Sequence, residues 1–362
     1  MRILHSESSK GWGGQENRTI NELIAMRELG HTLAVVAQPG ARIIDRAREN
    51  GFETFAIPMR GALDLPAIFR LRSLLRDWRA DILNTHSGRD TQLAGMAAHT
   101  LGRQRPRVVR TRHLALPITS RFTYAILPDH VVTVSAFVGD YLASAGVPRE
   151  MISAIPTGVD FSRYQPAPEG GQLRRELGLS DDTPLIGTIA ILRRKKGHIE
   201  LIEAITEVLR QFPEAHFVFA GDGPMEDRLR AAIAERGVAE RVHLLGLRRD
   251  VVNVLQSLDL FVLPTHQEAL GTAFIEAAAM GVPVVATRVD GVAEVVADGE
   301  TGLLVPALDV PALSQALCAM LADPARRRAM GERASERIRR LYSREVMASG
   351  MAALYTRLLE GR

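Results

Sequence analysis

Cysteine, long apolar runs and paired aspartates are scarce or missing in this 362-residue chain. The single cysteine, Cys318, cannot form a disulfide within the chain, which excludes a disulfide-stapled secreted domain and favours a reducing compartment. No apolar stretch reaches the roughly 18 residues needed to cross a bilayer, and the opening residues, MRILHSESS, do not resemble a signal peptide. The pattern Asp-x-Asp is absent, which argues against a metal site. We therefore expect a cytoplasmic protein.

The formal net charge is only +3, but arginines cluster in two places. Arg70, Arg72, Arg76 and Arg79 alternate with large apolar residues in AIFRLRSLLRDWRAD, and five more arginines follow in GRQRPRVVRTRH (102–113). Basic residues among apolar ones can dock on an anionic membrane or a phosphorylated glycolipid. The alternative is an ordinary helix with a solvated basic face. Nucleic acid is not expected as a partner, because no nucleic-acid-binding motif accompanies the arginines.

Short apolar runs alternate with helical patterns along the first half of the chain, and the same rhythm restarts at LIGTIAIL (185–192). This alternation predicts an α/β protein with two Rossmann-like domains, each built on a parallel sheet with helices on both faces. Ligands are then expected at the carboxyl ends of the strands, in the crevice between the domains. The stretch 155–184, rich in proline, glycine and aspartate, marks the boundary. We divide the chain into residues 1–160, residues 161–340 and a final helix in 341–362.

The segment EALGTAFIE is bracketed by Glu268 and Glu276 and lies between two apolar runs, LDLFVLP and VPVVAT. Its pattern predicts a loop at the end of a buried strand, followed by a helix that closes at Gly281. Both carboxylates would then lie at one rim, with the open N–H groups of the helix start between them. Such a site offers an anion position flanked by two hydroxyl acceptors, which suits a sugar diphosphate.

Two other segments follow predicted strands. Four consecutive cations in ILRRKKGH (191–198) would repel one another, so a bound anion is their natural partner. Glycines in GWGGQE (11–16) let a ligand approach the start of a helix. Their spacing is not G-x-G-x-x-G, and no acidic residue follows about 20 residues later, so a dinucleotide cofactor and a dehydrogenase are disfavoured.

The carboxylate pair with its flanking strands, together with RRKKGH and the hinge-like IPTGVD, resembles the retaining glycosyltransferases of family 4. The resemblance implies the two-domain GT-B fold, with parallel sheets facing across a cleft. It also implies that 1–160 binds the acceptor, that 161–340 binds a nucleotide-sugar, and that the helix in 341–362 packs back on the first domain. Three positions depart from the family pattern. Ala269 replaces a common glycine, and Asp290 precedes Gly291 where a second glycine is commoner. The usual arginine position holds Ile191, which makes Arg193 the better candidate.

Residue roles are carried over by this resemblance. Glu276 would hold the ribose hydroxyls, and Glu268 the hydroxyls of the transferred sugar. Arg193 and Lys196 would neutralise the departing diphosphate, and His113 would contact the sugar near the reacting centre. The remaining donor-site candidates are Gly13, Gly14, Gly221, Gly223, Leu247, Arg248, Leu270, Gly271 and Thr272. His86, at the end of another predicted strand, is the acceptor-side candidate, although histidines in such positions are often structural.

The expected function is transfer of a sugar from a nucleotide-sugar to a hydroxyl of a glycan or lipid-linked acceptor, with retention of configuration. The transfer would need neither a metal nor another cofactor. Family members that build bacterial lipopolysaccharide or other surface glycans are the most similar, which places the enzyme in the cytoplasm or on the inner face of the membrane. Two alternatives stay open: a nucleotide-sugar epimerase or hydrolase on the same fold, and a non-catalytic nucleotide-sugar-binding protein.

Overall fold

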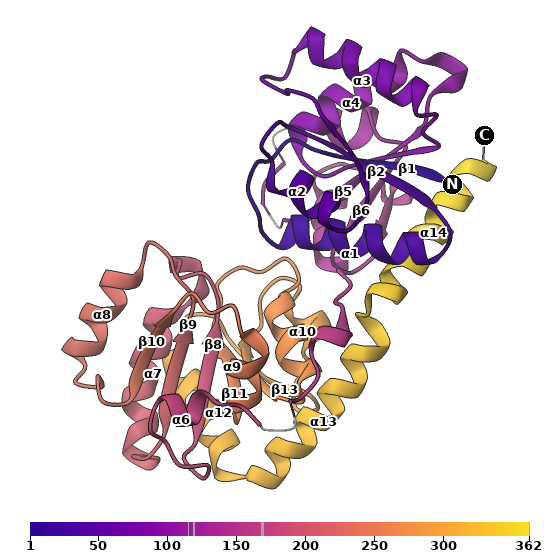
Figure 1. Cartoon of the computed structure of the whole chain (residues 1–362). Coiled ribbons are helices and arrows are strands. Elements are labelled where there is room, and N and C mark those ends of the chain that lie inside the picture. Colours follow the sequence, from indigo (N-terminus) through magenta and orange to yellow (C-terminus); the bar gives the residue numbers. More distant parts are fainter. Residues whose placement is uncertain (115, 119, 168–169, 362) are drawn as a thin grey trace. The chain divides into compact units, whose positions relative to one another are not determined.

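The chain forms two compact units, described here from a computed structural model that covers residues 1–114, 116–118, 120–167 and 170–361. Unit 1 comprises Met1–Val159 and Tyr342–Arg362, and unit 2 comprises Asp160–Leu341. Figure 1 shows both units, coloured along the sequence. Unit 1 therefore contains both ends of the chain, and unit 2 is one continuous insertion between them.

Unit 1 is built on a seven-stranded sheet in the order β3-β2-β1-β4-β5-β6-β7, in which neighbouring strands are parallel. Its central strands are buried on both faces, as expected in a parallel sheet covered by helices, whereas the edge strands β3 and β7 are half-buried or exposed. The strands are β1 (Arg2–Glu7), β2 (Thr32–Ala37), β3 (Glu53–Ala56), β4 (Ile82–Thr85), β5 (Arg107–Arg112), β6 (His130–Thr133) and β7 (Ile152–Ala154).

The two faces of this sheet carry separate apolar cores, because neighbouring strand residues point to opposite sides. Ile3 and Val35 pack with the helices on one face, and Leu4 and Val36 pack with those on the other. One face is covered by α1 (Gly14–Glu28), α2 (Arg42–Glu49) and α14 (Arg344–Glu360), and the other by α3 (Leu65–Asp77) and α4 (Gly88–His99). Helix α5 (Ala136–Ser144) packs beside β6 and β7.

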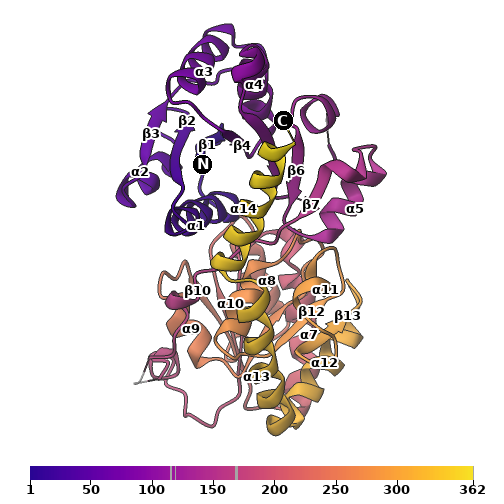
Figure 2. The ribbon, with the colours of Figure 1, turned by 90° about the vertical axis from the view of Figure 1, so that its right-hand side faces the viewer.

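Helix α14 lies against α1, as both views of unit 1 show (Figures 1 and 2). Its buried face supplies Met347, Met351 and Tyr355 to the same core as Ile3 and Val35. The chain re-enters unit 1 where Val159 donates its N–H to the Tyr342 carbonyl at 2.8 Å. The last helix is therefore an integral layer of unit 1.

Unit 2 has a six-stranded parallel sheet in the order β10-β9-β8-β11-β12-β13. Its strands are β8 (Leu185–Ile189), β9 (His216–Ala220), β10 (Val242–Gly246), β11 (Leu260–Leu263), β12 (Val284–Thr287) and β13 (Gly302–Val305). Its helices are α6 (Leu173–Glu176), α7 (His198–Gln211), α8 (Glu226–Glu235), α9 (Val251–Ser257), α10 (Thr272–Ala279), α11 (Val292–Val295), α12 (Val310–Ala322) and α13 (Pro324–Leu341).

The α/β class with two parallel, Rossmann-like sheets is confirmed. Two edge strands, β7 and β13, were not expected from the sequence. Strand β7 has only three half-buried or exposed residues, so its apolar pattern is weak. Strand β13 follows the turn signals of ADGETG, which conceal a short strand.

Candidate active site

The carboxyl rim of the unit 2 sheet is a continuous set of interlocked loops. The Gly221 N–H donates to the Gly246 carbonyl at 2.8 Å, which joins the loops after β9 and β10. The Leu192 N–H donates to the Asp222 carbonyl at 2.8 Å, which joins the loops after β8 and β9. The loop after β11 joins the loop after β8 through the His266 N–H, which donates to the Lys195 carbonyl at 2.7 Å. These backbone bonds fix the positions from which the predicted donor-site residues project.

Two glycines make these close approaches possible. Gly197 has φ +74°, and a Cβ there would lie 1.9 Å from the Pro264 carbonyl oxygen. At Gly221, with φ +152°, a Cβ would lie 2.0 Å from the Ala190 carbonyl oxygen. A side chain at either position would both strain the backbone and separate neighbouring loops. Gly223, also a predicted site residue, has φ +153° and contacts Leu192 in the same way.

Lys196 and Glu268, predicted from separate motifs, form an ion pair through Nζ and Oε2. Both side chains are about four-fifths buried, with exposures of 18% and 21%. Of the neighbouring cations, Arg194 pairs with Glu200 at 3.5 Å, while Arg193 and Lys195 are exposed. The structure therefore brings a cation and a carboxylate together at the rim and leaves the Arg193 side chain exposed.

The loop that holds Glu268 is itself held by the loop after β12. Asp290 accepts a hydrogen bond from the Glu268 N–H at 2.9 Å, and the Gly291 N–H donates to the Glu268 carbonyl at 3.1 Å. Leu270 is buried beside this contact. Gly271 follows with φ +91° and caps α10, so Thr272 begins the helix and its first N–H groups lie next to Glu268 along the chain.

Glu276 lies in the second turn of α10. Burial raises the pKa of its carboxyl to about 7, and the Tyr164 hydroxyl and the Arg163 charge oppose this shift. Tyr164 was not among the predicted site residues. It lies in the segment that enters unit 2, where nothing in its sequence context distinguished it from a linker residue.

If Glu276 holds the ribose hydroxyls, as the sequence predicts, its raised pKa makes nucleotide binding dependent on pH. A carboxylate accepts two hydroxyl hydrogen bonds better than the protonated acid does, so binding favours the ionised form and lowers its pKa. Below pH 7 the free protein must release a proton to bind, and we expect the Kd for the preferred nucleoside diphosphate to fall as pH rises from 6 to 8. Calorimetry in buffers of different ionisation enthalpy measures this proton release. The Glu276→Gln variant should show no such dependence, and equal proton release by both proteins would contradict the assignment.

Leu247 and Arg248 follow β10 at the same rim. The Leu247 side chain is 64% exposed. The Arg248 guanidinium is held by Glu176 at 2.8 Å and Asp250 at 2.6 Å. The Arg248 side chain is therefore already paired with these two carboxylates. The backbone of this turn is the part that a nucleobase could contact.

In unit 1, three histidines form a row: His5 lies within β1, and His86 and His113 directly follow β4 and β5. His5 Nδ1 lies 3.0 Å from His86 Nε2, and His86 Nδ1 lies 3.1 Å from His113 Nε2. His5 and His86 are buried, whereas His113 is partly exposed. Both ring nitrogens of His86 are thus occupied by other histidines, so His86 has no free nitrogen for an acceptor. His5 was missed because it lies within a strand.

The predicted glycine loop begins α1, where Gly13 is the capping residue and Gly14 the first helical residue. Neither has a left-handed backbone, and an added Cβ would meet ordinary contacts or open space. Their assignment to donor binding stays a prediction. Beside them, burial together with the Asp90 charge raises the pKa of Glu7 to about 8, and Ser87 donates to Glu7 at 3.0 Å. Glu7 was also missed, although it ends β1.

Both halves of the chain match family profiles of glycosyltransferases. Residues 12–163 match "Glycosyltransferase Family 4", and residues 171–337 match "Glycosyl transferases group 1". Among the solved structures, a glycosyltransferase from Rickettsia africae superposes with a TM-score of 0.89 at 21% identity, covering 100% of this chain and 99% of the other. Anabaena HepE in complex with UDP and glucose gives a TM-score of 0.84 at 20% identity, covering 98% and 99% of the two chains. These likenesses show the GT-B fold.

The chain also resembles named relatives along its sequence. The chain is 31% identical over 332 residues to the GDP-mannose-dependent alpha-(1-6)-phosphatidylinositol monomannoside mannosyltransferase of Mycolicibacterium smegmatis, covering 86% of each chain. It is also 31% identical over 238 residues to the lipopolysaccharide core biosynthesis mannosyltransferase LpsB of Rhizobium meliloti, covering 64% of this chain and 66% of the relative. With the paired loops of Lys196 and Glu268 on a GT-B scaffold, the chain belongs to glycosyltransferase family 4 and is a retaining glycosyltransferase.

Proposed function

We propose that the rim of unit 2 binds a nucleotide-sugar and that the enzyme transfers its sugar to a hydroxyl of a glycan or lipid-linked acceptor. The observation that carries this proposal is the contact between Lys196 and Glu268 beside the start of α10. A diphosphate replaces the carboxylate as the partner of Lys196, and Glu268 is then free to accept hydrogen bonds from the sugar. The ion pair of the free protein holds both side chains in place for this exchange.

The donor's two ends are recognised by different chemistry. Arg193, Lys196 and the first N–H groups of α10 surround the diphosphate, since a helix start and cations both favour negative charge. Glu276 accepts hydrogen bonds from the ribose hydroxyls. The backbones of Leu247 and Arg248, with Gly221 and Gly223 beside them, border the nucleobase side of the site. Leu270, Gly271 and Thr272 border the sugar.

Transfer proceeds at one face of the sugar. The bond between the anomeric carbon and the phosphate oxygen breaks, while the acceptor hydroxyl forms the new bond on the same face and gives its proton to the departing phosphate oxygen. Arg193 and Lys196 meet the charge that develops on the diphosphate, a task that a metal ion performs in other transferases. Transfer is therefore expected to continue in the presence of EDTA.

The names of the two relatives point to mannose from GDP-mannose as the first donor to test, and to an anionic, lipid-linked or lipopolysaccharide acceptor. The single free cysteine is compatible with the cytoplasm, where the enzyme would work at the inner face of the membrane. Donor preference can be found from thermal shifts with GDP, UDP and ADP. The function is tested by incubating the matching nucleotide-sugar with and without acceptor, and reading the new linkage and its configuration by NMR. Donor turnover without an acceptor would identify a hydrolase or epimerase instead.

We also propose peripheral contact with an anionic membrane through unit 1. A groove of about 560 Å³ is lined by apolar side chains of α3, α4 and the single π-helical turn Phe122–Ile126. Leu65, Phe69 and Ile126 are exposed by 59%, 67% and 62%, which is unusual for a cluster of large apolar side chains. Arg72 lines the groove, and Arg70 and Arg76 are exposed on the same helix. No helix in the described ranges is long and apolar enough to cross a bilayer.

Replacing Phe69 and Ile126 together with serine should weaken vesicle binding by at least about tenfold, because each buried aromatic or aliphatic side chain contributes roughly 1.5–3 kcal/mol. Co-sedimentation with phosphatidylglycerol vesicles measures this binding. The electrostatic contribution of the arginines to binding should be abolished when phosphatidylcholine vesicles are used, and likewise at high salt. Leu308→Ser removes an apolar side chain of similar exposure, 62%, from unit 2 and serves as the matched control. Equal vesicle binding by the natural protein, the double serine variant and Leu308→Ser would exclude the groove as the docking surface.

A further inference from the structure

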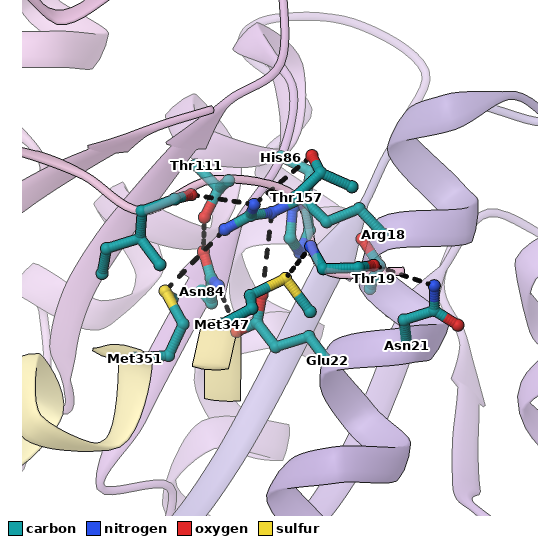
Figure 3. A network of polar contacts seen from close by, with 12 residues as sticks. Arg18, Thr19, Asn21, Glu22, Asn84, His86, Thr111, Thr157, Met347 and Met351 are labelled. Atoms are coloured by element: carbon teal, nitrogen blue, oxygen red, sulfur yellow. Dashed lines mark hydrogen bonds and ion pairs between the residues drawn. The ribbon is translucent and has the colours of Figure 1, made fainter. Parts of the chain in front are cut away.

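The carboxylate of Glu22 lies in a buried polar network of unit 1, in which Figure 3 labels Glu22, Asn84 and Thr111. The Thr111 hydroxyl donates to Asn84 Oδ1 at 2.9 Å, which fixes the orientation of the Asn84 amide. Asn84 Nδ2 then donates to the Tyr355 hydroxyl at 2.9 Å, and that hydroxyl donates to Glu22 Oε1 at 3.0 Å. Each group donates its hydrogen bond in the direction of Glu22, whose carboxylate oxygens act as acceptors.

The row of histidines meets the same carboxylate from the other side. His5 Nε2 lies 3.8 Å from Glu22 Oε1, with both side chains at most 1% exposed. His5 and His86 are stacked, with ring centroids 5.2 Å apart and planes at 12°. The row therefore links the partly exposed His113 to Glu22 through two buried rings.

All three rings are neutral near pH 7. Burial lowers the pKa of His5, despite the opposing charge of Glu22. Burial also lowers the pKa of His86 and His113 well below the usual value, and the nearby Arg18 charge adds to this effect. A neutral imidazole carries one N–H and one acceptor nitrogen, so the two hydrogen bonds of the row must point the same way.

The position of Glu22 determines in which direction the hydrogen bonds of the histidine row point. If the protons pointed outward, the lone pair of His5 Nε2 would face the Glu22 oxygen, and two acceptors would oppose each other in a buried site. With the protons pointing inward, His5 Nε2–H faces the carboxylate, His86 Nε2–H donates to His5, and His113 Nε2–H donates to His86. Arg18, which is fully buried, lies 4.0 Å from Glu22 Oε2.

We propose that His5 and His86 are positioning residues that hold His113 as its Nε2–H tautomer and so present its Nδ1 as a hydrogen-bond acceptor for a sugar hydroxyl. Among the described residues, no hydrogen bond is made to Nδ1 of His113. In this tautomer the ring can receive a hydroxyl proton but cannot donate to a phosphate oxygen. The inference rests on the proposed function for its ligand, whereas the tautomer itself is a property of the free protein.

The tautomers can be read directly by long-range ¹⁵N–¹H NMR of the full chain labelled at its histidines. The expected result is a single Nε2–H form for His5, His86 and His113. His5→Phe keeps the stacked ring but cuts the link to Glu22, so His113 should become a mixture of both tautomers. His130→Phe is the matched control, since His130 is also buried in unit 1 but bonds to Ser153 outside the row, and it should leave His113 unchanged.

A second measurement separates positioning from folding. His5→Phe should lower kcat about fivefold, the value of roughly one neutral hydrogen bond, while the affinity for the nucleoside diphosphate stays unchanged. An Nδ1–H form of His113 in the natural protein would overturn the proposal even if the variant failed to fold. A single Nε2–H form that persists in His5→Phe would remove His5 from the role. Absence of sugar transfer by the natural protein would refute the proposed function but leave the tautomer result standing.

Discussion

Lys196→Ala is expected to lower kcat by about 100-fold, with little change in overall fold. Removing one preorganised group that stabilises developing negative charge typically costs between about 10² and 10³ in rate. Initial rates with saturating nucleotide-sugar and acceptor measure the effect.

Lys195→Ala is the matched control for this experiment. It removes the same charge from the neighbouring position, but its side chain is exposed and its contact with the next loop is made by its backbone carbonyl. We expect its kcat to stay within about twofold of the natural enzyme, as for an exposed charge screened by solvent. Similar losses in both variants would mean that only net charge matters, and natural turnover in Lys196→Ala would remove that residue from the mechanism.

Glu276→Ala is expected to weaken binding of the nucleoside diphosphate by about 100-fold while changing kcat at saturating donor much less. Hydrogen bonds to a charged group contribute about 1.5–3 kcal/mol each, and two ribose hydroxyls would lose their acceptor. Because the ribose is remote from the reacting carbon, its contacts are the same in the ground state and the transition state, so KM should carry the loss.

Calorimetry with the preferred nucleotide and with its 2′-deoxy form provides the internal control for Glu276. The natural enzyme should bind the deoxy form more weakly, and the variant should no longer distinguish the two. If Glu276→Ala still prefers the ribose form, the hydroxyls are recognised elsewhere. A variant that lowers kcat without changing nucleotide affinity would point instead to contact with the sugar.

The sequence allowed a correct prediction of which loops meet at the rim of unit 2. Lys196 and Glu268 follow β8 and β11, and neighbouring parallel strands end at the same edge of a sheet. The sequence did not reveal which of the cations have carboxylate partners within the protein. The run of four cations appeared to require an external anion, yet Arg194 and Lys196 have carboxylate partners on other elements, Glu200 and Glu268.

The histidine row of unit 1, in which only His5 was missed, depends on strand order. His5, His86 and His113 are brought into one row because β1 pairs with β4 and β4 pairs with β5, although β1 and β4 are far apart in the sequence. Pairings between distant strands leave no local signature. Tyr164 was missed for another reason: its segment carries turn signals, and its contact with Glu276 arises from tertiary packing.

The covering of the unit 1 sheet by α14 has a consequence for biosynthesis. The first 159 residues leave the ribosome early, but the surface that receives Met347, Met351 and Tyr355 stays bare until α14 has been synthesised. Unit 2, a continuous stretch, emerges complete before that point and can fold while its neighbour waits. A nascent chain stalled or truncated before residue 342 should therefore carry one finished half and one that exposes apolar surface to chaperones and proteases.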